Sequence, residues 1–425
     1  MALTRPVGPP GTVDQPGGAA KAGAARHVTP IVLIQLMDRP HPGTHGSVSH
    51  MGALDARALS VPGAVPGAGH DRLVSLFMRP AAPTPRPCPE MTLDLSGPPG
   101  SGYAGQPEWA RAHARDLVMT FTEHLPRAWH ALADLVRVRT RGRFDAEVRA
   151  IAAWAGVPWR RAMLGNVAAE LALGRLAARP RPADGADPPL ALDRSHTGLP
   201  GCSTLALATP SGPVLARNLD FWPPEVLSRT SAVVRYRDAA GERFTVAAWP
   251  GSVAVATGLS HRGGFALATN AVPVGGRVNP LGWPVLLAMR GVLEDARSFE
   301  QALDMVVRAR LAGPVAVILC GTRNEQRAVV ERIPGRAGVR RPERDGAPLV
   351  ATNDCRAVPP PARIPAWFRT SGPRFERLAA LADGSVDPDD DRLLGMLTDP
   401  GVRQSFTAQH AIIRPGHGVV RMWAA

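Results

Sequence analysis

The chain of 425 residues has little cysteine and no long apolar runs. Its four cysteines, at positions 88, 202, 320 and 355, are too few and too scattered for a disulfide framework or a paired zinc site. No run of about 18 apolar residues is present, so the sequence predicts no membrane-spanning helix. The apolar stretch from Ile31 to Met37 lacks a preceding basic segment and a clean cleavage site. We therefore expect no signal peptide and a cytoplasmic location.

Lysine is also nearly absent, because Lys21 is the only lysine among the 49 basic residues. A formal net charge of +13 would normally suggest a nucleic-acid partner. However, the arginines are scattered, and only two tyrosines are available to stack on bases. We interpret the arginine excess as the coding bias of a GC-rich genome, and we expect no nucleic-acid partner.

Glycine and proline, in contrast, are abundant, with 43 and 44 residues. The first part of the chain is rich in both and has no sustained period, so we expect residues 1–104 to be a disordered or mis-assigned N-terminal extension. Alternative starts in this part are Met51, Met78 and Met91. Three histidines there have a spacing that superficially resembles a metal site: His41, His45 and His50. Without supporting structure, we expect no metal and no cofactor.

Residues 105–201 are expected to form a helical segment. Apolar residues recur at spacings of three and four from Leu117 to Val136, the period of an amphipathic helix. Further helices are expected over 144–155 and 159–176. A polar, proline-rich connector, residues 177–200, then ends directly before Gly201-Cys202.

Residues 202–425 read mainly as strands and helices in alternating groups. Short apolar runs between turn residues predict strands at 202–208, 213–218, 231–237, 243–249, 253–259, 264–270, 314–320, 326–333, 348–352, 408–413 and 418–423. Helices are expected at 283–295, 298–311, 372–382 and 389–397. The helix at 298–311 opens with a capping-box pattern, Ser298 and Gln301. This order predicts an α+β fold of stacked antiparallel sheets with outer helices, in one domain from about 105 to 425.

The most informative stretch is a predicted hairpin that begins at Cys202. A tight turn follows at 210–212, and the return strand ends in Arg217-Asn218-Leu219-Asp220. A hairpin of this length returns Arg217 and Asp220 to the side of Cys202. A thiol nucleophile, a cation and a carboxylate would then lie together, where they can tune cysteine chemistry. The alternative is a small buried cysteine in a core strand that is followed by an ordinary turn.

This stretch resembles the N-terminal-nucleophile cysteine hydrolases, a family that includes penicillin acyltransferases, acid ceramidases, N-acylethanolamine acid amidases and bile salt hydrolases. In that family a Cys-Thr-Ser strand is followed by Arg-Asn-x-Asp at a spacing similar to that found here. Three later motifs follow in the same order: the strand ending at Asn270, the Thr-Asn pair at Asn353 and the Ser-x-x-Arg helix start at Arg374. With the closing segment from Thr407 to Val420, the resemblance covers roughly residues 105–425.

The resemblance implies a four-layer αββα fold and a self-cleaving precursor. The Cys202 thiolate would attack the Gly201 carbonyl, and cleavage would free the Cys202 α-amino group to act as the general base. The helical segment 105–201 and the catalytic segment 202–425 would stay associated. In the site that the resemblance implies, Arg217 would order the site electrostatically and Asp220 would hold the α-amine. Asn353 and Asn270 would bind the oxyanion. Arg374 would be the later arginine of the family, with Arg369 as an alternative.

Two departures from the family pattern bear on the activity. Ser203 and Thr204 exchange the usual Thr and Ser, which keeps the hydroxyl chemistry. Asp354 stands where the acyltransferase branch often has histidine, which weakens assignment to that branch. We therefore expect hydrolysis of a linear N-acyl amide through a thioester, on a small-molecule substrate in an apolar pocket built partly from Phe221, Trp222 and Trp283.

Three alternatives stay open at this point. One is acyl transfer, in which an amine takes the acyl group instead of water. Another is a non-catalytic binding member of the family. The last is a papain-like pair of Cys202 with His261 or His410 that acts without chain cleavage.

Overall fold

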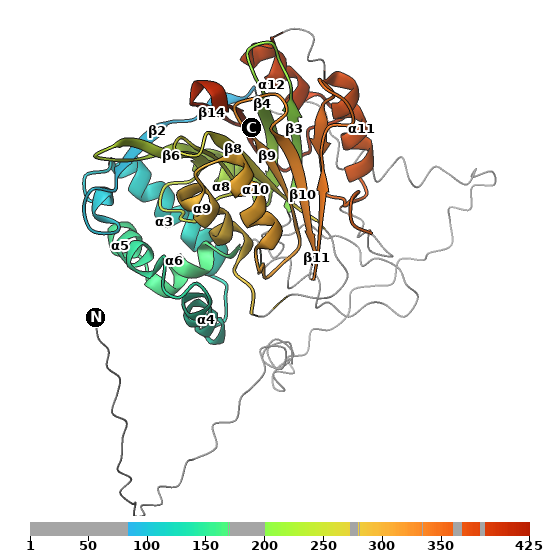
Figure 1. The fold of residues 1–425 in the computed structure, drawn as a ribbon. Helices are drawn as coiled ribbons and strands as arrows, with labels where there is room; N and C mark the ends of the chain where they lie inside the picture. The colour runs from blue at the N-terminus through green and yellow to red at the C-terminus, as the bar shows by residue number, and fades with distance from the viewer. Residues whose placement is uncertain are drawn as a thin grey trace, which may run out of the picture. The chain divides into compact units, whose positions relative to one another are not determined.

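Two stacked sheets form the centre of the fold (Figure 1). The structure is a computed structural model, and it describes residues 84–168, 170, 200–272, 279, 281–333, 335–359, 368–382 and 387–425. All of these fall within the unit Val61–Ala425. The expected helix end near 176, the connector 177–199 and the histidines at 41, 45 and 50 lie outside the described residues.

Among the described residues, the strands form one sheet of six strands and one of eight. The six-stranded sheet has the order β1 (Arg86–Pro87), β14 (Val419–Ala424), β13 (Thr407–Arg414), β4 (Val214–Phe221), β3 (Pro200–Leu207) and β12 (Leu349–Ala351). The eight-stranded sheet has the order β11 (Arg336–Arg340), β10 (Arg327–Ile333), β9 (Val315–Cys320), β8 (Phe265–Ala271), β7 (Thr257–Ser260), β6 (Gly241–Ala248), β5 (Ala232–Asp238) and β2 (Glu90–Asp94). Neighbouring strands are antiparallel except β2 and β5, which are parallel.

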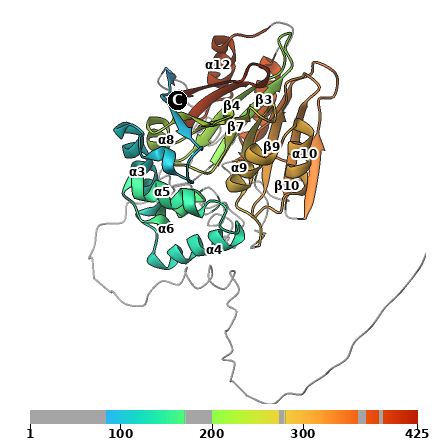
Figure 2. The same ribbon diagram turned by 60° about the vertical axis from the view of Figure 1, so that its left-hand side comes forward.

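Alternation along the strands places one apolar set between the sheets and others under the helices. The set between the sheets includes Ala206, Leu215, Ala266 and Ile318, whose small or compact side chains let the sheets approach closely. Helices α11 (Ser371–Leu381) and α12 (Asp390–Thr398) cover the outer face of the six-stranded sheet. Helices α9 (Val285–Asp295) and α10 (Phe299–Arg308) cover the outer face of the other (Figure 2). The predicted α+β, four-layer αββα fold is therefore confirmed.

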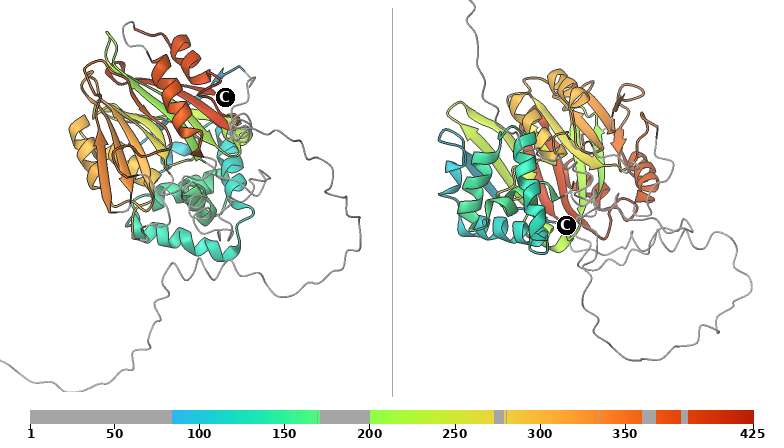
Figure 3. Two further views of the ribbon diagram at one scale, coloured as in Figure 1. Left: turned by 90° about the vertical axis from the view of Figure 1, so that its right-hand side faces the viewer. Right: turned by 90° about the horizontal axis from the view of Figure 1, so that it is seen from below.

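The helical segment packs beside α9 and the eight-stranded sheet (Figure 3). It comprises α3 (Glu108–Thr122), α4 (Ala131–Arg139), α5 (Asp145–Ala155) and α6 (Trp159–Gly165). The single helix predicted around 117–136 is wrong, because α3 ends at Thr122. Pro126 has an extended backbone, with ψ of 145°, and a short 3-10 turn, η2 (Arg127–His130), leads into α4. Proline disfavours helical backbone in the residue before it, which interrupts the apolar period.

Most of the expected strands and helices in 202–425 lie within a few residues of those observed. The turns at 210–212 and 239–241 join β3 to β4 and β5 to β6. Ser298 caps α10 by accepting a hydrogen bond from the Gln301 backbone N–H, as its pattern predicted. The strand expected at 253–259 begins only at Thr257, and β11 was not predicted. Short helices at α8 (Pro224–Arg229), η1 (Ser101–Tyr103) and η4 (Pro415–His417) complete the elements.

The N-terminal expectation differs from the structure over residues 84–104. Strand β1 pairs with β14 in one sheet, and β2 pairs with β5 in the other, so this part belongs to the fold. Both strands are too short, and too closely flanked by prolines, for their period to stand out. In β2 only Met91 and Leu93 are buried. No helix of the described part of the chain is long and apolar enough to cross a membrane.

Candidate active site

The hairpin of β3 and β4 sorts the site residues onto two faces of the six-stranded sheet. Cys202 lies opposite Leu219, Thr204 opposite Arg217, and Gly201 opposite Asp220. Residues that pair directly across antiparallel strands share a face, and successive residues alternate between faces. The thiol of Cys202 and the guanidinium of Arg217 therefore lie on the inner face, toward the other sheet. The Asp220 carboxylate lies on the outer face, toward α11.

Arg217 holds the Cys202 thiol on the inner face. Its Nη2 lies 2.8 Å from the Cys202 Sγ and 2.7 Å from the Thr269 carbonyl oxygen. Its Nη1 donates to the Ala256 carbonyl oxygen at 2.6 Å and also to the Thr257 hydroxyl. Arg217 is 1% exposed, and within the described residues its acceptors include no carboxylate. Of the acceptors described at this guanidinium, the Cys202 sulfur is thus the one that can become an anion.

At the other three cysteines, burial outweighs the charge of the nearby arginine, which is Arg86 for Cys88, Arg327 for Cys320 and Arg340 for Cys355. Burial raises the pKa of the Cys88, Cys320 and Cys355 thiols to about 12 each. A thiol in that range is protonated at neutral pH and is a poor nucleophile. The structure therefore gives these three cysteines a packing role.

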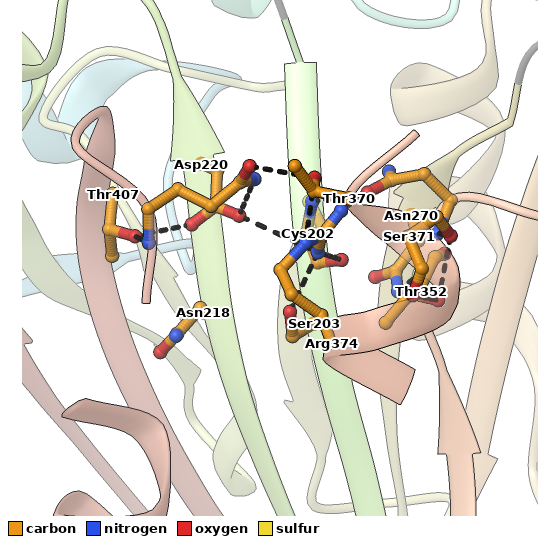
Figure 4. A network of polar contacts seen from close by, with 12 residues as sticks. Cys202, Ser203, Asn218, Asp220, Asn270, Thr352, Thr370, Ser371, Arg374 and Thr407 are labelled. Atoms are coloured by element: carbon orange, nitrogen blue, oxygen red, sulfur yellow. Dashed lines mark hydrogen bonds and ion pairs between the residues drawn. The ribbon is translucent and has the colours of Figure 1, made fainter. Parts of the chain in front are cut away.

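Arg374 hydrogen-bonds to the Cys202 backbone from the outer face of the sheet (Figure 4). Its Nη1 donates to the Cys202 carbonyl oxygen at 2.7 Å and to the Ser203 hydroxyl at 2.8 Å. Its Nη2 donates to the Asn353 Oδ1 at 2.7 Å. Burial lowers the pKa of the Arg374 guanidinium, while the Asp220 charge opposes that shift. Of the two sequence candidates, Arg374 is the one in the site, since Arg369 is exposed.

Asp220 has a donor on each carboxylate oxygen. Gln404 Nε2 donates to its Oδ2 at 2.7 Å, and the Thr407 hydroxyl donates to its Oδ1 at 2.6 Å. The Arg374 Nη1 lies 3.9 Å from Oδ2. A bulge at Ala408 in β13 lets both Thr407 and Asp220 point outward, because the register shifts by one residue between Thr407 and Gln409.

Asn353 and Asn270 both reach the site, with different hydrogen-bonding capacity. The Asn353 Oδ1 accepts the Cys202 backbone N–H at 3.0 Å, and its Nδ2 donates to the Ala271 carbonyl oxygen at 2.7 Å. One of its two amide hydrogens is thus engaged within the described residues. Asn270 Nδ2 donates to two carbonyl oxygens, of Ala351 at 2.9 Å and Thr352 at 3.0 Å. As placed here, Asn270 has no amide hydrogen left for an oxyanion.

A hydroxyl and carboxylate cluster fixes the Asn353 backbone. The Ser371 hydroxyl accepts the Asn353 N–H at 2.8 Å and lies 2.8 Å from both Thr352 Oγ1 and Asp354 Oδ1. The Asp354 carboxylate also pairs with Arg356 at 3.1 Å. Asp354, the departure from the acyltransferase pattern, therefore supports the loop that carries Asn353.

Neither candidate histidine lies beside the thiol. His410 Nδ1 lies 2.7 Å from the Asn218 Oδ1, on the outer face of the sheet. His261 Nε2 lies 2.8 Å from the Thr245 hydroxyl and 3.1 Å from Glu242. No hydrogen bond joins either ring to Cys202 within the described residues. The geometry thus gives no support to a Cys-His pair.

The six site residues chosen from the sequence all lie in one network, and Gly201 lies directly before Cys202, opposite Asp220. Sequence reasoning missed four buried partners of that network: Thr370, Ser371, Gln404 and Thr407. Ser371 was quoted as part of the Ser-x-x-Arg motif without a role. Thr370 directly precedes α11 and Gln404 lies in the turn before β13, where no local pattern distinguishes them. Thr407 was named only as the start of the closing segment, without a role.

A family model described as "Acyl-coenzyme A:6-aminopenicillanic acid acyl-transferase" matches residues 207–410. The resemblance to the N-terminal-nucleophile cysteine hydrolases is confirmed. The match contains Arg217, Asp220, Asn270, Asn353 and Arg374 and begins after Cys202. The general activity of the family is enzymatic, in acyl transfer or amide hydrolysis.

The chain was also compared with solved structures and with curated proteins. A solved structure titled "Caenorhabditis elegans N-acylethanolamine-hydrolyzing acid amidase (NAAA) ortholog" is 20% identical, with a TM-score of 0.43. That alignment covers 51% of this chain and 93% of the nematode chain. No curated protein matches the chain significantly.

Proposed function

We propose that the chain is a self-cleaving N-terminal-cysteine amidohydrolase that acts on linear N-acyl amides through a thioester at Cys202. The observation that carries this proposal is the pairing of Arg217 with the Cys202 sulfur. A fully buried cation without a carboxylate partner is costly. A thiolate, or the oxyanion next to it, would be its counter-ion during the reaction. The matching family model is described as an acyl-transferase, and a thioester at a cysteine suits acyl transfer as well as hydrolysis.

Self-cleavage would use the Gly201–Cys202 peptide bond. The Cys202 sulfur attacks the Gly201 carbonyl carbon, a carbon–sulfur bond forms, and the carbon–nitrogen bond breaks as the nitrogen takes a proton. Water then hydrolyses the thioester, which leaves a Gly201 carboxylate and returns the thiol to sulfur. The contacts of Arg374 and Asn353 with the Cys202 backbone would hold that peptide in place during both steps.

Turnover would use the α-amino group that cleavage creates. The reference pKa of an α-amine, about 8, suits a general base near neutral pH. This amine would take the thiol proton, and sulfur would attack the substrate carbonyl. The amine leaving group takes the proton, and water releases the acid. Asn353 is the favoured oxyanion donor because one amide hydrogen is not engaged, whereas both of those on Asn270 are.

Ion pairs across the cleavage point support the expectation that the two segments stay together. Arg143 Nη1 of the helical segment lies 2.6 Å from Asp295, and Arg290 Nη2 of the catalytic segment lies 3.2 Å from Glu147. The partner is proposed to be a small N-acyl compound rather than nucleic acid. The cytoplasmic location stays a prediction.

The test of hydrolysis is turnover of a fluorogenic N-acyl amide by the purified cleaved protein. Quenched samples should carry the acyl mass on the Cys202 fragment, and hydroxylamine should remove it as a hydroxamate, as expected for a thioester. Absence of both amine release and the acyl adduct in cleaved protein would contradict the proposal. The alternative, acyl transfer, is distinguished by adding an excess of amine. Transfer predicts N-acylated amine as the main product, whereas hydrolysis predicts free acid.

The acyl chain should be apolar. Phe221 stacks on Phe121 at a centroid distance of 5.5 Å, and Trp283 meets Phe144 edge-on at 6.4 Å. Aromatic side chains of the expected pocket thus pack against α3 and against the residue that directly precedes α5. Burial of each methylene contributes about 0.8 kcal/mol, so an octanoyl amide should have a far higher kcat/KM than an acetyl amide. Equal kcat/KM values for the two amides would contradict an apolar pocket.

A further inference from the structure

A directed path of hydrogen bonds on the outer face leads from Arg374 to Asp220. Arg374 Nε donates to the Thr370 Oγ1 at 3.2 Å, and the Thr370 hydroxyl donates to the Gln404 Oε1 at 3.0 Å. Gln404 Nε2 then donates to the Asp220 Oδ2 at 2.7 Å. All four side chains are buried, so no water competes for these partners.

The path fixes which way the Gln404 amide points. Thr370 receives a hydrogen from Arg374, and its own hydrogen therefore goes to the Gln404 oxygen. The nitrogen of the amide must then face Asp220. A glutamate at this position would put one carboxylate against another, and a methionine would leave the Asp220 Oδ2 without its short donor.

The same amide touches the residue before the proposed cleavage point. A Cβ added to Gly201 would lie 2.7 Å from the Gln404 Nε2 and 3.1 Å from the Asp220 Cβ. The end of a glutamine can ordinarily move aside at little cost. Here, moving aside would break its hydrogen bonds to Thr370 and Asp220. A side chain at position 201 would therefore disturb the carboxylate through Gln404.

We propose that Gln404 is a positioning residue that, with Thr370, holds the Asp220 carboxylate against the Gly201–Cys202 bond. Glycine is required at 201 because the Gln404 amide occupies the space of its missing side chain. After cleavage, the carboxylate held in this way lies beside the new α-amino group. The inference rests on the proposed function and adds residues that neither the motifs nor the comparisons assign.

The test compares Gln404→Met, Thr370→Val and Thr370→Ser with the full-length wild type. Gln404→Met and Thr370→Val should each slow self-cleavage and lower kcat by roughly tenfold to a hundredfold, the cost of a misplaced reacting group. KM should change little, because Gln404 lies on the face away from the thiol. Thr370→Ser keeps the hydroxyl and should restore both rates.

Gln409→Met is the matched control. Gln409 is also a buried glutamine, but its Nε2 donates to the Ser231 hydroxyl at 2.7 Å on the inner face, away from Asp220. Its loss should lower stability and leave the self-cleavage rate near that of the wild type. Equal rates for Gln404→Met and wild type, or equal losses in Thr370→Ser and Thr370→Val, would overturn the inference. A wild type that neither cleaves nor hydrolyses would instead overturn the proposed function.

A double-mutant cycle tests the link to Gly201 directly. Gly201→Ala should slow self-cleavage strongly in the wild-type background. In the Gln404→Ala background, where the amide is gone, the same substitution should cost clearly less. If Gly201→Ala costs the same factor in both backgrounds, the glycine is needed for another reason, and that half of the inference is wrong.

Discussion

Arg217 and Arg290 are equally buried, at 1% exposure each, but they have opposite surroundings. Arg290 pairs with Glu294 at 2.8 Å and with Glu147 at 3.2 Å, and its guanidinium lies 4.4 Å from the Tyr236 ring centroid. Arg217 meets two carbonyl oxygens, one hydroxyl and the Cys202 sulfur. The charge of Arg290 is neutralised by glutamates of the protein, whereas Arg217 is placed beside an atom that would become an anion during the reaction.

This difference separates a structural arginine from a functional one without reference to any motif. A buried ion pair that loses one partner leaves an uncompensated charge, which is strongly destabilising. Arg217 has no carboxylate acceptor among the described residues, so its replacement strands no buried carboxylate. The two arginines should therefore respond to the same substitution in opposite ways.

The largest effect on activity is expected from Arg217→Met. Self-cleavage and turnover should fall by about a hundredfold or more, because the positive charge beside the reacting sulfur is gone. The free energy of unfolding should stay the same or rise, since the substitution removes a buried charge that has no carboxylate partner among the described residues. Intact-mass time courses and urea denaturation measure the two quantities. A large loss of stability with a normal rate of self-cleavage would contradict a functional role of Arg217.

Arg290→Met should do the reverse. It leaves the buried Glu147 without its cation, while Glu294 keeps Arg143 at 2.7 Å, so the free energy of unfolding should fall by about 3–5 kcal/mol. The molecules that remain folded should cleave at nearly the wild-type rate, because Arg290 makes no contact with Cys202 in its described surroundings. The measurement is urea denaturation beside cleavage at low temperature. Cleavage lost as completely as in Arg217→Met would contradict the structural role.

His410 is a third buried titratable group, and unlike the two arginines it is neutral at pH 7. Burial lowers the pKa of His410 to about 3, and the charge of Arg403 adds to the shift. In the unfolded chain the value is about 6.5, so the unfolded state binds more protons between these pH values. Stability should be constant above about pH 6.5 and fall as the pH drops toward 3. His410→Gln should remove part of this slope in urea titrations; an unchanged slope would contradict the assignment.

Local patterns predicted the centre of the site because the turn of a hairpin fixes which residues of its two strands lie opposite each other. Once Cys202 begins a strand and the turn falls at 210–212, the pairing places Arg217 and Asp220 beside it, as the structure shows. The alternation of side chains along a strand also predicts that Arg217 and Asp220 lie on opposite faces of the sheet. The later motif residues, Asn353 and Arg374, were identified from the family resemblance, since they come from a loop and a helix far along the chain.

The rest depended on tertiary packing that no local pattern records. Gln404 and Thr370 meet Asp220 and Arg374 only because the turn before β13 and the start of α11 lie against the same sheet face. Strands β1 and β2 gain their partners from β14 and β5, far along the chain. Pro126 could have been read as a helix break, but the apolar spacing across it suggested continuity.

The most direct test of the account is intact-protein mass spectrometry of the wild type beside Cys202→Ala. We expect a wild-type fragment that begins at Cys202, with its complementary N-terminal fragment, and a single uncut chain in the variant. A single uncut chain in both proteins would contradict self-cleavage by Cys202. The same cleavage in both would show that another agent cuts the chain.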